Sequence, residues 1–162
     1  MKKLILVLLS FLLLGCSYKS EELDTTMYEE YYRTIDNNID YDDKLPFSYS
    51  FEYSQLQDGS YRYVVIIDNP EYSMYDCTLL IRENGITYDN QKKMMPSSGI
   101  FDKKYSLIPN QVDTAHGFPK GIALGGEVEE FPFTLDVMVE WFNNTQSKAS
   151  RVFFKIDTSI SE

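Results

Sequence analysis

The chain has 162 residues, of which 43% are hydrophobic and 25% charged, and its formal net charge is −10. This acidity argues against nucleic acid as a partner, because phosphate backbones are bound through lysine and arginine side chains. The length is sufficient for one folded domain but not for two.

The first sixteen residues combine a positive start, an apolar run and a cysteine. Two lysines precede the run, which covers residues 4–14 with one interruption at Ser10, and Gly15 stands before Cys16. The run has eleven residues, whereas a transmembrane helix needs ~20. The pattern is therefore typical of an export signal.

The residues Leu13-Leu14-Gly15-Cys16 resemble the lipobox of bacterial lipoproteins, and the resemblance covers residues 1–16 only. It implies cleavage before Cys16 and attachment of a diacylglyceryl group to its sulfur. Two or more acyl chains, such as palmitate, anchor a protein stably where a single chain is marginal. The resemblance thus places the mature protein on the extracytoplasmic side of a cell membrane. With Ser17 after the cysteine, that would be the outer membrane in a Gram-negative cell.

The segment from residue 16 to residue 44 is expected to be an acidic tether. Nine acidic residues and only one basic residue, Arg33, lie between residues 20 and 43. Thr26 and Glu29 fit a capping box, which predicts a short helix over residues 27–35. We nevertheless expect residues 17–43 to form a mobile spacer, because the segment is highly charged and lacks an aliphatic face. The expected division is a signal peptide over 1–15, a lipidated tether over 16–44 and a domain over 45–158.

From residue 45 onward, apolar and polar residues alternate, which predicts strands. The first alternating run contains Phe47, Tyr49, Phe51 and Tyr53, and an Asp58-Gly59 turn predicts a hairpin with the next run. Further strands are expected over residues 74–82, 105–108, 122–124, 131–142 and 152–156.

The strand expected over residues 131–142 has one apolar side, which indicates the side that faces the core. Its apolar side carries Phe133, Leu135, Val137, Val139 and Trp141, while Asp136, Met138 and Glu140 share the other side. About seven short strands predict an all-β fold, an antiparallel sandwich that resembles immunoglobulin domains. The cysteine and tryptophan spacing of true immunoglobulin domains is missing, and a small β-barrel is the alternative.

Few residues suggest catalysis, and no cofactor or metal is expected. His116 is the only histidine and reads as part of an exposed loop, with no partner at a metal-ligand spacing. Cys77 alternates in phase with Leu79 and Ile81, which predicts a thiol in the core. We expect no enzyme. An envelope enzyme with an unrecognised site and a small-ligand carrier remain alternatives.

Residues 109–126 are rich in glycine and proline and are the candidate binding loop. Within them, His116, Phe118 and Lys120 are candidate partner contacts. Phe118 is either an exposed anchor or a plug that seals one end of the sandwich. The sequence therefore predicts a membrane-anchored binding module whose partner is an envelope protein or polysaccharide.

Overall fold

A computed structural model describes residues 23–38 and 40–160, and the lipobox with Cys16 lies outside them. Within these residues, the first sheet contains β1 (Ser48–Gln55), β2 (Tyr61–Asp68) and β6 (Gly121–Val128) in the order β1-β2-β6. The second contains β3 (Met74–Glu83), β4 (Ser97–Ser98), β5 (Tyr105–Leu107), β7 (Thr134–Phe142) and β8 (Ala149–Asp157). Its order is β4-β3-β7-β8, and β5 also pairs with β3. None of the helices in this part of the chain is long and apolar enough to cross a membrane.

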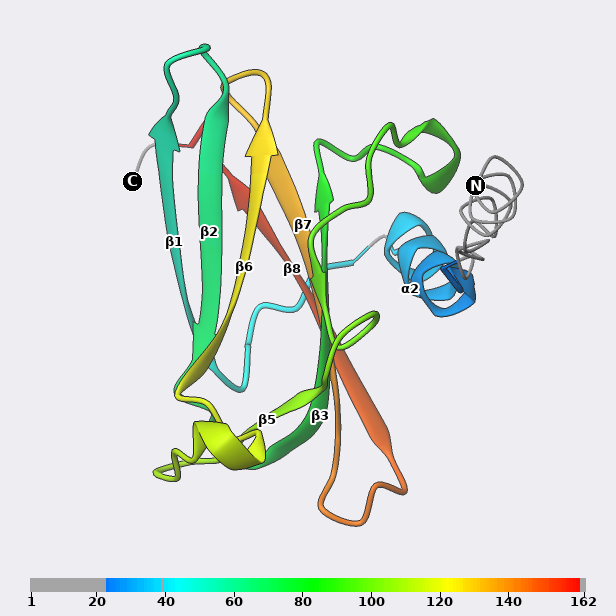
Figure 1. Ribbon diagram of the computed structural model, residues 1–162, viewed down its shortest axis with the longest axis vertical. Coiled ribbons are helices and arrows are strands. Elements are labelled where there is room, and N and C mark those ends of the chain that lie inside the picture. The colour runs from blue at the N-terminus through cyan, green and yellow to red at the C-terminus, as the bar shows by residue number, and fades with distance from the viewer. Residues whose placement is uncertain (1–22, 39, 161–162) are drawn as a thin grey trace, which may run out of the picture.

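The two sheets face each other as an antiparallel β-sandwich, and the strands do not close into a barrel (Figure 1). Strands β1, β2 and β6 form one layer, while β3, β7 and β8 are the long strands of the other, with β8 at its edge. Among the six long strands of the described residues, the first, second and fourth thus lie in one layer and the third, fifth and sixth in the other, as in an antiparallel β-sandwich. The predicted fold class is confirmed.

The core between the sheets follows the period-two alternation of the strands. Val65 and Ile67 of β2 face Leu79 and Ile81 of β3, and all four side chains are buried. Cys77 lies in the same phase and is buried as predicted. Burial raises the pKa of its thiol to about 12, so the group packs as a small apolar side chain.

Strand β6 is longer than expected and takes in residues 121–126, the last third of the predicted binding loop. Gly121, Gly125 and Gly126 pair with β2 and do not belong to a loop. Glycine inside a strand often marks a close approach of another group, and a Cβ at Gly121 would stand 2.9 Å from the carbonyl oxygen of Ile67. The loop therefore ends at residue 120, and the expectation of a loop to residue 126 is wrong.

Helix α2 (Thr26–Asp36) confirms the predicted short helix, but its start differs from the expected capping box. Thr25 is the N-cap, and no side-chain bond caps the helix there. Asp24 accepts a hydrogen bond from the backbone N–H of Thr26 at 2.9 Å instead. An ion pair of 2.8 Å between Glu29 and Arg33 joins successive turns.

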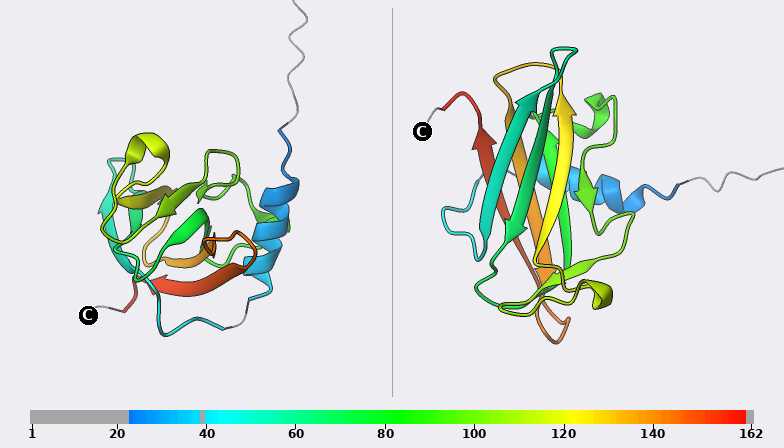
Figure 2. Two further views of the ribbon diagram at one scale, coloured as in Figure 1. Left: turned by 90° about the horizontal axis from the view of Figure 1, so that it is seen from below. Right: turned by 60° about the vertical axis from the view of Figure 1, so that its left-hand side comes forward.

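The helix packs on the outer face of the five-stranded sheet as a third layer (Figure 2). Its residues Tyr28, Tyr32 and Ile35 are buried against Leu80 of β3 and Met138 of β7. The expectation of a mobile spacer is thus wrong for residues 26–36, because three side chains at helical spacing provide an apolar stripe. The side of β7 that carries Met138 is also covered rather than exposed to solvent.

Buried charges fasten the helix at its C-terminal end. Arg82 of β3 donates hydrogen bonds of 2.8 and 2.6 Å to Asp136 of β7 and one of 3.1 Å to Asp36 of α2. The hydroxyl of Tyr41 donates to the other oxygen of Asp136 at 2.6 Å. Burial and this bond raise the pKa of Tyr41 to about 12. One arginine therefore neutralises carboxylates from both layers.

Candidate functional site

A pocket of about 300 Å³ lies at the loop that the sequence singles out. One wall comes from the β2–β3 turn with Asn69 and Pro70, and the rest comes from Leu107 and the loop that follows. The loop itself is closed twice: Gln111 donates to the carbonyl of Ile108 at 3.2 Å, and Asp113 donates to that of Phe118 at 2.7 Å. These bonds hold the pocket on a fixed backbone.

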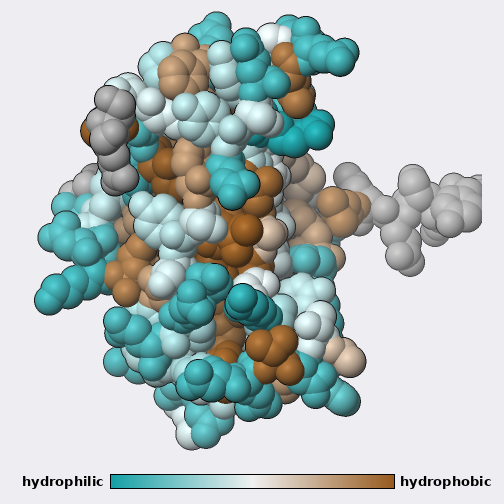
Figure 3. Space-filling model, turned by 90° about the vertical axis from the view of Figure 1, so that its left-hand side faces the viewer, coloured by the Kyte–Doolittle hydropathy of each residue, from teal (hydrophilic) through white to brown (hydrophobic). Residues whose placement is uncertain are grey.

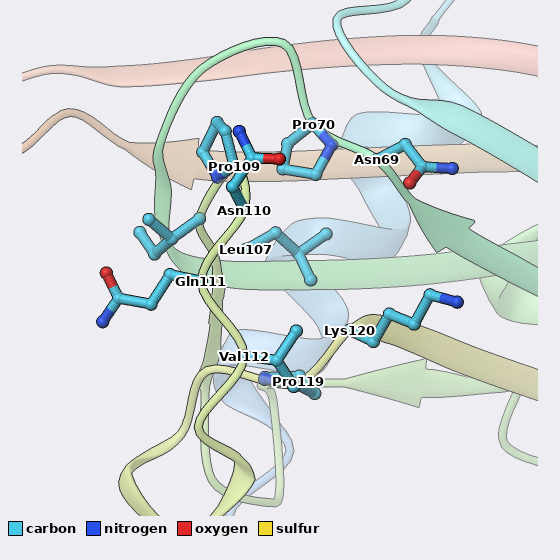
Figure 4. A pocket seen from close by; sticks show the side chains of 10 residues that line it. Asn69, Pro70, Leu107, Pro109, Asn110, Gln111, Val112, Pro119 and Lys120 are labelled. Carbon is cyan, nitrogen blue, oxygen red and sulfur yellow. The ribbon is translucent and has the colours of Figure 1, made fainter.

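The pocket has an apolar middle and a polar side (Figure 4). Leu107 lies in the centre, between Pro70 and Pro109 on one side and Val112 and Pro119 on the other. Asn69, next to Pro70, and Lys120, next to Pro119, lie at opposite ends of this slot, and both side chains extend to the same side of it. Among the described residues that line it, Lys120 is the only charged one. A pocket without a carboxylate contrasts with the acidic chain as a whole.

Both asparagines that line this pocket have a left-handed backbone conformation. Asn69 has φ 45° and Asn110 has φ 59°. Residues other than glycine seldom adopt this conformation, and asparagine tolerates it better than most. Sparsely populated backbone conformations of this kind gather at ligand sites more often than elsewhere.

The three candidate contacts from the sequence do not converge. Lys120 lines the pocket, whereas His116 and Phe118 are not among the lining residues. His116 is exposed at the end of η2 (Thr114–His116), and its Nδ1 lies 2.7 Å from Oδ2 of Asp113. Phe118 is half-buried, so it is neither a fully exposed anchor nor a completely buried plug.

A second pocket, of about 560 Å³, lies at the opposite end of β6 and contains charged residues that the sequence reasoning missed. Glu83 is 2% exposed. Its carboxylate accepts a hydrogen bond of 2.8 Å from the Tyr63 hydroxyl and forms an ion pair of 2.8 Å with Lys93. Glu127, Glu129 and Glu130 also line this pocket. The carboxylate of Glu83 is fully engaged, which makes it a structural link between β2, β3 and the segment before β4.

Glycine at position 126 is what allows this buried pair to form. A Cβ there would overlap the Tyr63 hydroxyl and stand 2.6 Å from Oε1 of Glu83. Burial and the nearby carboxylate of Glu83 raise the pKa of Tyr63, so the hydroxyl remains a hydrogen-bond donor. The signal was present in the sequence, because Glu83 continues the inward phase of Leu79 and Ile81.

The fold and the pockets define an antiparallel β-sandwich with ligand-sized hollows at both ends of β6. No group of three or more metal-ligating side chains occurs within residues 23–38 and 40–160. No protein-family model matches the chain, and no curated protein matches it either.

Proposed function

We propose that this protein is a lipid-anchored, extracytoplasmic binding module of a bacterial cell envelope. The motif that ends at Cys16 supports the anchor. The pocket beside Lys120 supports the binding role, because a rigid scaffold with a ligand-sized hollow in a connecting loop is the usual arrangement of a binding site. The partner is an envelope protein or polysaccharide.

The chemistry of the pocket favours a ligand group with an apolar body and an anionic or carbonyl end. Leu107 and the proline rings offer contact surface to the body. Lys120 and the Asn69 side chain supply donors on the same side of the slot. A carboxylate-terminated side chain or chain end of the partner meets both requirements.

Replacing Cys16 by serine tests the anchor. The variant is expected to leave the membrane fraction and to appear as a soluble or uncleaved chain, because serine has no thiol to receive the diacylglyceryl group. Fractionation and the intact mass of the mature protein measure this. Ser17→Ala, one residue further on, is the matched control and should remain in the membrane. An unchanged distribution and mass of the Cys16→Ser protein would contradict the proposal.

A pair of probes of opposite charge tests the pocket. Butyrate and butylamine share a short apolar chain, and we expect only butyrate to shift the amide NMR signals of Asn69, residues 107–112 and Lys120. The protein would be residues 16–162 with Cys16→Ser. So small a ligand is expected to bind with a Kd in the millimolar range or weaker, on the order of −4 kcal/mol.

The control for the pocket is a lysine at another place. Lys120→Gln should abolish the butyrate shifts, whereas Lys148→Gln, in the exposed β7–β8 turn, should leave them unchanged. Equal responses to both probes, or shifts away from the pocket, would remove the assignment of this site.

A further inference from the structure

Strand β1 is an edge strand without the usual protection. It pairs with β2 on one side, and no strand of the described residues pairs with its other side. Natural edge strands are commonly guarded by lysine, proline or a bulge. Residues Ser48–Gln55 contain neither lysine nor proline, and the register with β2 runs without a shift. The only charged residue of the strand is Glu52.

The hydrogen-bond pattern identifies which backbone groups of β1 are free. Just beyond the strand, the N–H of Leu56 donates to the carbonyl of Ser60 at 2.8 Å, which marks a hydrogen-bonded pair. In an antiparallel ladder such pairs recur at every second residue. The even-numbered residues of β1 therefore bond to β2, and Tyr49, Phe51, Tyr53 and Gln55 direct their N–H and C=O groups outward.

The opposite edge of the sheet supports this alternation. The odd-numbered residues of β2 bond to the even-numbered residues of β6. The backbone N–H and C=O groups of the odd-numbered residues of β6 therefore point away from the sheet. The ammonium group of Lys93 does donate to the carbonyl of Glu127 there. That edge is thus partly occupied by a lysine, whereas none of the residues that the structure describes bonds to the outward backbone groups of Tyr49, Phe51 and Tyr53.

Exposed aromatic surface lies along the same open edge. Tyr49 and Tyr53 point to the core side of the sheet, yet they are 44% and 47% exposed because no strand lies beside them. Tyr49 packs on Phe154 with ring centroids 4.7 Å apart, and Tyr53 stacks on Phe131, itself 45% exposed, at 5.7 Å. Figure 3 views the molecule from the side of the three-stranded sheet and shows hydrophobic residues among hydrophilic ones there.

The sequence of β1 is nearly the same when it is read in either direction about Phe51. If two copies of the strand pair antiparallel with Phe51 opposite Phe51, then Tyr49 meets Tyr53, Ser48 meets Ser54 and Ser50 meets Glu52. Every apolar residue faces an apolar residue, every polar residue faces a polar one, and the two carboxylates do not oppose each other. Such a self-complementary patch is what a two-fold symmetric interface requires.

Neighbouring registers fit less well. A shift of two residues in one direction places Glu52 directly opposite Glu52, and like charges in that position destabilise a sheet. A shift in the other direction places Tyr53 opposite Phe47, which precedes the strand and is buried in the core. The match is therefore specific to one alignment.

We propose that two copies of this chain associate through β1, so that their three-stranded sheets join into one sheet of six strands. In this arrangement the pairs Phe51–Phe51, Tyr49–Tyr53 and Tyr53–Tyr49 each exchange two backbone hydrogen bonds across the two-fold axis. The dimer covers the exposed faces of Tyr49 and Tyr53. It leaves the pocket beside Lys120 open, because none of its lining residues belongs to β1.

Cysteine cross-linking in membranes tests the arrangement. Ser48 and Ser54 lie six residues apart, ~20 Å along a strand, which is too far for a disulfide within one chain. In the dimer they form non-hydrogen-bonded pairs with Cα atoms ~4.5 Å apart. The full-length Ser48→Cys/Ser54→Cys variant, exposed to a mild oxidant in isolated membranes, is therefore expected to run mostly as a dimer without reductant.

The two single variants are the matched controls. Ser48→Cys alone and Ser54→Cys alone should remain monomeric, while their co-expression should restore the cross-link. Buried Cys77 contributes no background. A monomeric double variant, or single variants that cross-link as strongly as the double one, would overturn the proposal; a foreign strand bound to β1 would give the monomeric result.

Charge at position 50 tests the register separately. Ser50→Lys would face Glu52 of the other copy and should raise the dimer fraction in sedimentation of residues 16–162 carrying Cys16→Ser. Ser50→Glu would face the same carboxylate and should lower it. The dimer fraction is expected to be highest for Ser50→Lys, intermediate for the chain that keeps Ser50, and lowest for Ser50→Glu. Equal dimer fractions for all three would overturn the alignment on Phe51.

Discussion

Replacing Arg82 by leucine is expected to lower the free energy of unfolding by about 3–5 kcal/mol, because the change leaves buried carboxylates without their counter-ion. The Arg82 side chain is 12% exposed, and those of Asp136 and Asp36 are 3% and 14% exposed. Lys155 cannot replace the arginine, since its ammonium group lies 3.9 Å from Asp136 and makes no hydrogen bond to it. Urea denaturation measures the loss.

Two further variants separate this effect from a general loss of charge. Arg62→Leu removes an exposed ion pair of 3.5 Å with Glu127 and should cost less than about 1 kcal/mol. The double variant Arg82→Leu/Asp136→Leu should recover only part of the stability lost in Arg82→Leu, because Asp136 no longer leaves an unpaired buried charge but Asp36 still lacks its counter-ion. Equal stability of Arg82→Leu and Arg62→Leu would show that the pairs around Arg82 do not fasten the helix.

Tyr32→Ala is expected to destabilise the domain by about 3–5 kcal/mol, the range for removal of a buried aromatic side chain. Tyr32 is fully buried on the side of α2 that faces the sheet, with its ring centroid 5.7 Å from those of Tyr28 and Tyr88. Its hydroxyl donates to the carbonyl of Ile86 at 2.8 Å. Tyr32→Phe removes only this bond and should cost about 1–2 kcal/mol.

Limited proteolysis gives an independent measure of the same contact. The unaltered chain should yield a stable fragment that begins before Thr26, whereas Tyr32→Ala should be cut within residues 26–43. Tyr72→Ala, at a position 49% exposed, is the control and should retain the longer fragment. A stable fragment that begins near residue 45 in the unaltered chain would show that α2 is dispensable.

The strands were predictable because apolar residues alternate with polar ones wherever one side of a strand faces the core and the other faces solvent. Val65 and Ile67, for example, are buried at alternate positions and are flanked by a turn that favours a hairpin. The short strand β4 escaped, because two serines carry no such pattern.

The position of α2 could not be predicted in this way. Its composition is acidic, and its buried stripe consists of two tyrosines and one isoleucine. In the sequence, so few apolar residues are equally compatible with a solvated segment. The partner that makes Asp36 a buried group is Arg82, 46 residues away in the sequence. Such a long-range pair leaves no local signal.

The candidate site was predictable only in part, because part of it comes from a segment that is distant in the sequence. The composition of the loop indicates Lys120, but the wall formed by Asn69 and Pro70 comes from the distant β2–β3 turn. Glu83 lies on the same side of its strand as Leu79 and Ile81, so its inward direction was visible in the sequence. How its charge is tolerated became clear only from the positions of Lys93 and Gly126 in the structure.

If Cys16 carries the proposed lipid anchor, the early start of α2 limits how far the domain can move from its bilayer. Only residues 17–25 separate Cys16 from Thr26, and a fully extended chain covers at most ~3.6 Å per residue. The first turn of the helix would then stay within ~36 Å of the acylated residue. A domain held in so thin a layer meets other residents of that surface at a high effective concentration. Millimolar affinity would suffice for a partner held in the same layer, but not for one in dilute solution.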